Sequence, residues 1–152
     1  MYRIHCQMRI GEYTKTVLGL AETVYRWLNA LTDLDMNRRL RIAQYAETIA
    51  NTLERTATAL DCYANEPKNR KARREAVREA ARIRGYIETI VEVLRPHLDG
   101  RKVAGVKRRL DQLDADKSLL DPDTTMPGIQ KRVDRLTAAE GYFRALADGL
   151  KA

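Results

Sequence analysis

The stretch that decides the fold is residues 10–31, IGEYTKTVLGLAETVYRWLNAL. On an α-helix its apolar side chains would lie along one stripe, and a stripe of this kind is not stable in water and must pack on another stripe. The stretch therefore predicts a helix that is one member of a bundle. Its apolar residues recur at alternating steps of three and four positions: Ile10, Tyr13, Val17, Leu20, Val24, Trp27 and Leu31.

Four further segments carry the same helical spacing of apolar residues. Each forms a stripe of its own, so all the stripes are expected to be buried against one another. A polar residue interrupts two of them, Thr56 in one and Glu140 in the other. The four segments span residues 42–60, 76–94, 103–113 and 129–150.

The breaks between these segments contain residues that start and stop helices. Asp33 or Asp35 is expected to cap the second helix, because a short acceptor side chain satisfies free N–H groups of the first turn. Asn65 with Pro67 is expected to do the same for the third helix. Residues 119–128, LLDPDTTMPG, form the clearest loop. Short connections make successive helices antiparallel neighbours.

Length and composition support a single helical domain. A chain of 152 residues is long enough for one core, and eight glycines, four prolines and one phenylalanine are few for a sheet-rich fold. We expect an all-α fold, an up-and-down antiparallel four-helix bundle with an additional C-terminal helix. Its parts are an N-terminal arm at 1–9, the helical bundle at 10–118, a loop at 119–128 and a C-terminal helix at 129–152, packed on the bundle or on a partner.

The sequence indicates that the protein is neither a membrane protein nor a secreted or metal-binding one. No apolar run approaches the roughly 18 residues of a membrane span, and residues 1–13 lack the apolar core of a secretory signal. Cys6 and Cys62 are too few for a disulfide framework, and with His5 and His97 they match no zinc-ligand spacing. We expect a cytoplasmic protein of a bacterium or phage-infected cell, with no metal, cofactor or membrane partner.

Motifs of catalysis are not found either. The sequence contains no Gly-rich phosphate loop, no nucleophile elbow and no His–Glu metal motif. Its carboxylates do not form an acid–base pair on one inward face. We therefore expect a protein that is not an enzyme.

One stretch of the third helix is strongly basic. Residues 65–85, NEPKNRKARREAVREAARIRG, hold eight Lys or Arg against three Glu. Residues 68–109 hold fourteen Lys or Arg against five Asp or Glu, a balance of +9, whereas the whole chain carries +7. A charge gathered in this way favours an anionic partner.

Helical geometry places the strongest part of this charge on the outer surface. With the apolar residues of 76–94 in the core, Arg74 and Arg78 lie almost opposite, and Arg70 and Arg82 flank them. These four arginines follow one another at a spacing of four residues. They are therefore expected to form one stripe along the helix.

Some of the basic side chains have an acidic neighbour at helical spacing. Glu75 is expected to pair with Lys71 or Arg78, and Glu79 with Arg82. This leaves Lys68, Arg70, Arg73, Arg74 and Arg84 without an obvious local partner.

Two interpretations of this surface stay open, a solvated helix face and a phosphate-binding face. Arginine suits bidentate phosphate binding, and no motif that reads base edges is present, so binding would follow the nucleic-acid backbone. An acidic protein or lipid surface is a further alternative. The candidate nucleic-acid-binding residues are Lys68, Arg70, Arg73, Arg74, Arg78, Arg82, Arg84, Lys107, Arg108 and Arg109.

The first helix also suggests self-association. Trp27 and Tyr13 belong to its apolar stripe, and Tyr25 widens that stripe at one edge. This arc is wider than a monomeric bundle needs, so we expect a homo-oligomer.

Two segments, LRIAQYAETIANTLERTATALDCYAN at 40–65 and NRKARREAVREAARIRGYIETIVEVL at 69–94, carry a family resemblance. They resemble the Avd-like four-helix bundles, the accessory proteins of diversity-generating retroelements and the related intervening-sequence proteins of large-subunit ribosomal RNA genes. The resemblance covers about residues 10–113 and rests on helix order. It implies a basic, non-catalytic bundle that forms a ring-like homo-oligomer and binds nucleic acid and a reverse transcriptase. We expect the nucleic acid to be RNA. The fifth helix departs from the family pattern.

A second likeness leads to a different function. Residues 38–60, RRLRIAQYAETIANTLERTATAL, are similar to helical modules attached to bacterial defence and signalling ATPases. That similarity implies a helical adaptor that recognises another protein, such as a defence ATPase.

Overall fold

The computed structural model describes residues 13–115 and 126–152. Within them all regular structure is helical, so the all-α expectation is confirmed. The arm at 1–9 and most of the loop at 119–128 lie outside the described residues. The helices are α2 Tyr13–Ala30, α3 Met36–Asn65, α4 Arg70–Leu94, α5 Gly100–Ala115 and α6 Met126–Lys151, with a short 3-10 helix, η1, at Arg95–His97.

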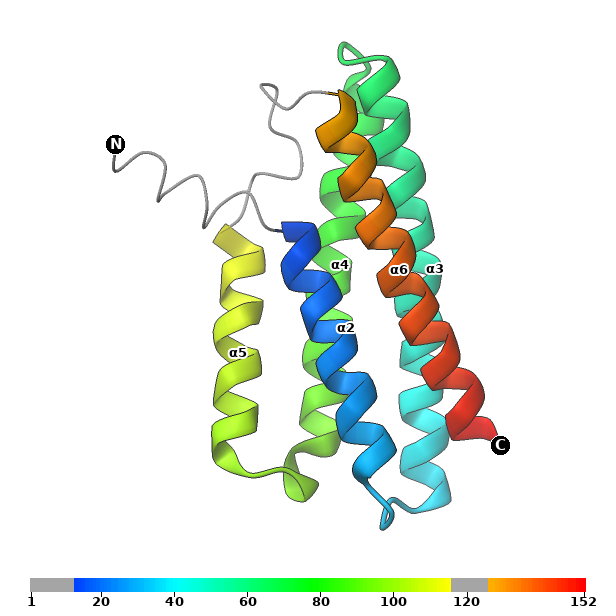
Figure 1. Cartoon of the computed structure of the whole chain (residues 1–152), viewed down its shortest axis with the longest axis vertical. Helices are drawn as coiled ribbons and strands as arrows, with labels where there is room; N and C mark the ends of the chain where they lie inside the picture. The colour runs from blue at the N-terminus through cyan, green and yellow to red at the C-terminus, as the bar shows by residue number, and fades with distance from the viewer. Residues whose placement is uncertain (1–12, 116–125) are drawn as a thin grey trace.

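The helices form an elongated bundle in which the chain runs up and down (Figure 1). Successive helices α2, α3, α4 and α5 alternate in direction, and α6 runs in the same direction as α2. The most extensive contacts of α3 are with α6 and α4, whereas α5 packs less extensively on α2 and α4.

The stripe that opened the sequence analysis is largely the core stripe of α2. Val17, Leu20 and Val24 are fully buried. Trp27 is only half-buried, and the buried residue in that turn is its neighbour Leu28. The stripe thus shifts by one position near the C-terminal end of α2.

The C-terminal helix packs on the bundle, one of the two positions expected for it, and is a central part of it. α6 packs along both α3 and α2 and contributes fully buried Phe143 and Leu136 to the core. α5 is the flanking helix, because its 16 residues bury only one short apolar stripe. α6 also begins at Met126, before the expected start at 129, since a proline such as Pro127 is tolerated in a first turn.

The helix caps agree with the sequence at one position and differ at another. The Asp35 side chain accepts the Arg38 backbone N–H at 2.8 Å, which lowers the pKa of its carboxyl group and caps α3 as expected. The cap of α4 is Asn69, whose Oδ1 accepts the Ala72 N–H at 3.0 Å. The expected cap Asn65 is instead the last residue of α3, because the turn that contains Pro67 still precedes the new helix.

The aromatic edge of α2 is covered within the chain. Tyr25 makes an edge-to-face contact with Tyr142 of α6, with ring centroids 5.6 Å apart. Trp27 packs against the core cluster. The feature that suggested self-association is therefore accounted for by intramolecular packing, and the homo-oligomer stays a prediction.

Candidate nucleic-acid interface

The first turns of α4 hold a cluster of cations where a helix usually favours acids. A helix N-terminus carries a partial positive charge, so cations there lower stability and acids raise it. The first turn of α4 contains no acidic residue. We call Lys68, Arg70, Lys71, Arg73 and Arg74 the α4 basic cluster. Such a conflict between local charge and stability is typical of functional sites.

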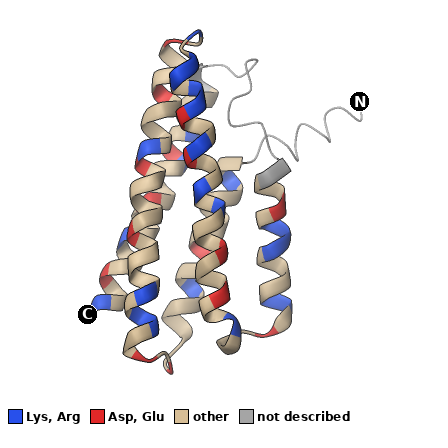
Figure 2. Cartoon of the chain, turned by 180° about the vertical axis from the view of Figure 1, so that it is seen from behind, with Lys and Arg blue, Asp and Glu red and all other residues tan. Residues whose placement is uncertain are grey.

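The side chains of this cluster are exposed. Among the described residues, none of them has an ion pair or side-chain hydrogen bond. Seen from behind, basic residues gather on the upper half of α4, where Glu75 and Glu79 lie among them, and the lower half is more acidic (Figure 2). The cluster thus presents uncompensated positive charge at one end of the bundle.

Lys71 is a member that the sequence did not assign to the site. Its expected partner, Glu75, pairs with Arg78 instead, at 3.7 Å. The spacing allowed both pairs, and only the side-chain geometry distinguishes them.

Arg78 and Arg82 continue the stripe, with partners. Arg82 lies 3.6 Å from the Glu79 carboxylate, as expected, and donates to the Tyr86 hydroxyl at 3.1 Å. This hydrogen bond raises the pKa of the Arg82 guanidinium. Both arginines remain exposed, so they can still face an anion at the edge of the cluster.

Arg84 is held inside the fold, which corrects the expectation that it lacks a partner. Its Nε donates to the Leu110 carbonyl oxygen at 3.1 Å, and its guanidinium pairs with Asp111 at 3.2 Å and Glu88 at 3.6 Å. The contacts with Leu110 and Asp111 join α4 to α5. Arg84 is therefore a structural residue.

Two of the three candidates on α5 also have structural contacts. Lys107 pairs with Glu92 of α4 at 3.5 Å, and Arg109 donates to Thr23 Oγ1 of α2 at 2.9 Å. Arg108 is exposed. The α5 candidates lie beside the C-terminal half of α4, where Lys107 meets Glu92 and the Leu110 carbonyl meets Arg84, whereas the basic cluster is at the N-terminal end of α4 (Figure 1). The two basic stretches do not form one surface.

The described residues also bear on metal binding and on membrane insertion. They contain no group of three or more His, Cys, Asp or Glu that could hold a metal ion. His97 lies 3.3 Å from Asp33, and both are in connections between helices. None of the described helices combines the length and apolar character that crossing a membrane requires.

Fold and site together define an all-α bundle with a basic cluster at one end. No family model matches the chain, and neither the curated proteins nor the solved structures contain a match. The likeness to Avd-like bundles therefore stays a prediction.

Proposed function

We propose that this protein is a non-catalytic accessory protein that binds the nucleic-acid backbone through the α4 basic cluster. The observation that supports this is the gathering of exposed, uncompensated cations on a helix N-terminus, where phosphate is favoured by both the side chains and the helix dipole. Arg78 and Arg82 extend the contact along α4.

The mode of binding is contact with phosphates. Successive arginines of the stripe are four residues apart, which is about 6 Å along a helix. The sequence contains no known motif that recognises base edges, so we expect the affinity to depend strongly on salt concentration and little on nucleotide sequence.

RNA as the ligand, a reverse transcriptase as the protein partner and a homo-oligomeric state belong to this proposal through the Avd-like resemblance. The fold is compatible with a role in a larger complex, because the cluster occupies only one end of the bundle (Figure 2).

The test is a titration of labelled RNA and DNA with Arg70→Gln/Arg74→Gln at two salt concentrations. The variant should bind more weakly, and each lost phosphate contact should reduce the log–log salt slope by about 0.7–0.9. Its stability should change by only a few tenths of a kcal/mol, since glutamine keeps helix propensity and the core is untouched.

The matched control is Arg26→Gln/Arg41→Gln. Both arginines are exposed, and they lie near the α2–α3 connection, at the opposite end of the bundle from the cluster. The control removes the same charge, so an equal loss of affinity in both variants would mean a general charge effect and would contradict the proposal.

A protein adaptor is the second candidate, and exposed apolar side chains favour it. Met36 and Leu40 are 57% and 47% exposed, one turn apart at the start of α3. If the wild type binds neither RNA nor DNA at low salt, this candidate replaces the first. A partner that wild-type protein captures from its host and Met36→Gln/Leu40→Gln does not would then support it.

A further inference from the structure

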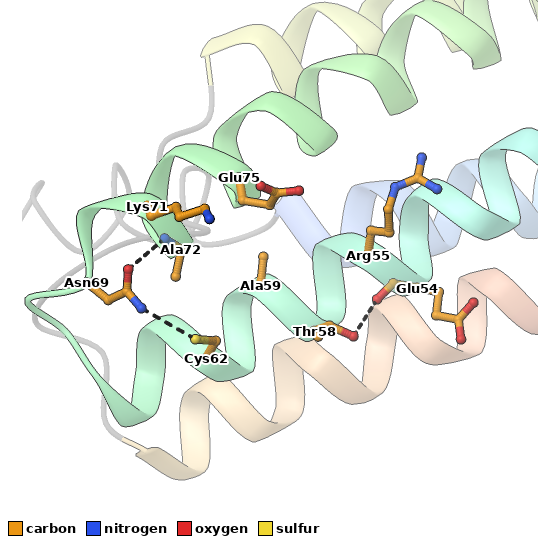
Figure 3. Close-up of a pocket in the computed structure, with 9 residues that line it drawn as sticks. All are labelled: Glu54, Arg55, Thr58, Ala59, Cys62, Asn69, Lys71, Ala72 and Glu75. Carbon is orange, nitrogen blue, oxygen red and sulfur yellow. Dashed lines mark hydrogen bonds between the residues drawn. The ribbon is translucent and has the colours of Figure 1, made fainter.

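An open groove lies between α3 and α4 beside the basic cluster. It has a volume of about 500 Å³, within the roughly 300–1,000 Å³ of small-molecule sites. Ala59 and Ala72 face each other across it, and their small side chains leave the space (Figure 3). Cys62 and Asn69 lie at one end and Arg55 at the other (Figure 3).

The carboxylates that line the groove are paired with arginines outside it. Glu54 pairs with Arg144 of α6 at 3.2 Å, and Glu75 pairs with Arg78 at 3.7 Å. Arg144 also pairs with Glu140 at 2.7 Å, so Glu54 is compensated only in part, whereas Glu75 has Arg78 as a partner of its own among the described residues.

The two cations that line the groove differ in whether an acidic side chain is already paired with them. Arg55 is engaged with Glu79 at 3.0 Å. Lys71 has no ion pair among the described residues and belongs to the α4 basic cluster as well. The groove therefore carries one free positive charge, at the side where it meets the cluster.

A polar group with spare hydrogen-bonding capacity completes the groove. Asn69 uses its Oδ1 to cap α4, but its Nδ2 makes only long contacts, 3.5 Å to Glu66 and 3.7 Å to Cys62 Sγ. The distance to Glu66 is beyond a good N–H···O bond, and the contact with Cys62 is a weak N–H···S bond, so the amide can exchange these partners for a ligand acceptor.

These features fit an anionic group attached to a small flat ring with acceptor atoms. We infer that the α3–α4 groove takes one unpaired nucleotide of a single-stranded nucleic acid, its base over Ala59 and Ala72 and its phosphates on the α4 basic cluster. The inference rests on the proposed function and adds a ligand class to it. A base in a duplex is stacked and paired, so it cannot leave the helix to enter the groove without unstacking.

Cys62 gives a direct readout, because its thiol is exposed at the groove. In a Cys6→Ser background Cys62 is the single cysteine of the chain. We expect saturating oligouridine or oligothymidine to suppress alkylation of Cys62 by N-ethylmaleimide, and a duplex of equal length, bound to the same extent, to leave the rate unchanged. The RNA and DNA arms show whether the 2′-hydroxyl matters.

The converse experiment blocks the groove without changing its buried alanines. A bulky maleimide adduct on Cys62 should weaken binding of the single strand and leave duplex binding intact. The control carries the same adduct on Ala104→Cys, an exposed position of α5, in a Cys6→Ser/Cys62→Ser background, and should bind both ligands normally.

The outcomes separate this inference from the proposed function. If single strands bind and Arg70→Gln/Arg74→Gln weakens them, but Cys62 is not protected, the groove is not the site and the basic cluster still is. Equal protection by duplex and single strand also overturns the inference. If neither ligand binds at low salt, both proposals fail.

Discussion

Glu79 is a buried carboxylate at the contact between α3 and α4. Only 3% of Glu79 is exposed. Arg55 of α3 lies 3.0 Å from one of its carboxylate oxygens, and Arg82 of α4 lies 3.6 Å from the other. A charge in such a place is tolerated only when it is paired, and losing the partner leaves the desolvation cost uncompensated. The sequence predicted the pair with Arg82 from helical spacing, but not the closer pair with Arg55.

We predict that Arg55→Met destabilises the fold more than Arg82→Met. Arg55 makes the shorter contact and is the partner on the other helix, so its loss should cost about 1–3 kcal/mol, whereas Arg82 should cost less than about 1 kcal/mol. Urea unfolding followed by circular dichroism measures both. Arg41→Met, at an exposed position, controls for the change in side chain, and equal losses for Arg55 and Arg82 would refute the argument.

At the scale of the element, α4 has an N-cap residue that satisfies a backbone N–H of its first turn, but the helix dipole disfavours the cations in that turn. Asn69 satisfies the Ala72 N–H, and the turns that follow carry Arg70, Lys71 and Arg74. Stability alone would place acids here. The helix can keep these cations because its burial against α3, through residues such as Ile83 and Ile87, supplies the stability.

We predict that Asn69→Asp stabilises the protein and weakens nucleic-acid binding. Aspartate caps as well as asparagine, and its charge should add about 0.3–1 kcal/mol at low salt through the helix dipole. The gain should lie at the lower end of this range, because the new carboxylate oxygen replaces Asn69 Nδ2, which lies 3.5 Å from Glu66 Oε2. Binding should weaken because the same charge offsets one cation of the cluster. Unfolding midpoints and titrations at low and high salt measure both effects.

Asn65→Asp is the matched control, since it adds the same charge at the last residue of α3. A negative charge at a helix C-terminus opposes the dipole, so this variant should gain no stability. A gain for Asn69→Asp that persists unchanged at high salt would show that electrostatics is not the cause.

At the same scale, the sequence predicted whatever depends on spacing within one helix. The stripe of Val17, Leu20 and Val24 and the outward position of Arg74 follow from 3.6-residue periodicity alone. The structural role of Arg84 did not follow, because its partners Leu110 and Asp111 are on another helix. Residue spacing cannot reveal partners that only tertiary packing brings together.

At the scale of the whole molecule, the position of α6 is the main feature that the sequence did not reveal. Its apolar stripe is interrupted by Glu140, and the sequence left open whether the helix packs on the bundle or on a partner. In the structure Glu140 pairs with Arg144 at 2.7 Å, and Arg144 also reaches Glu54 of α3 at 3.2 Å. Lys151 pairs with Glu47 of α3 near the end of the chain. The interruption is therefore part of the contact with α3.

This arrangement predicts the order in which the bundle opens. α6 is packed on two helices and buries Phe143, whereas α5 packs less extensively on its neighbours. Local opening free energy follows buried contact, so we expect backbone amides of α5 to exchange with deuterium before those of α6. Peptide-level exchange measured by mass spectrometry tests this. If α6 exchanged first, it would be the more loosely held helix, and the contacts of Arg144 and Lys151 would contribute little to holding it.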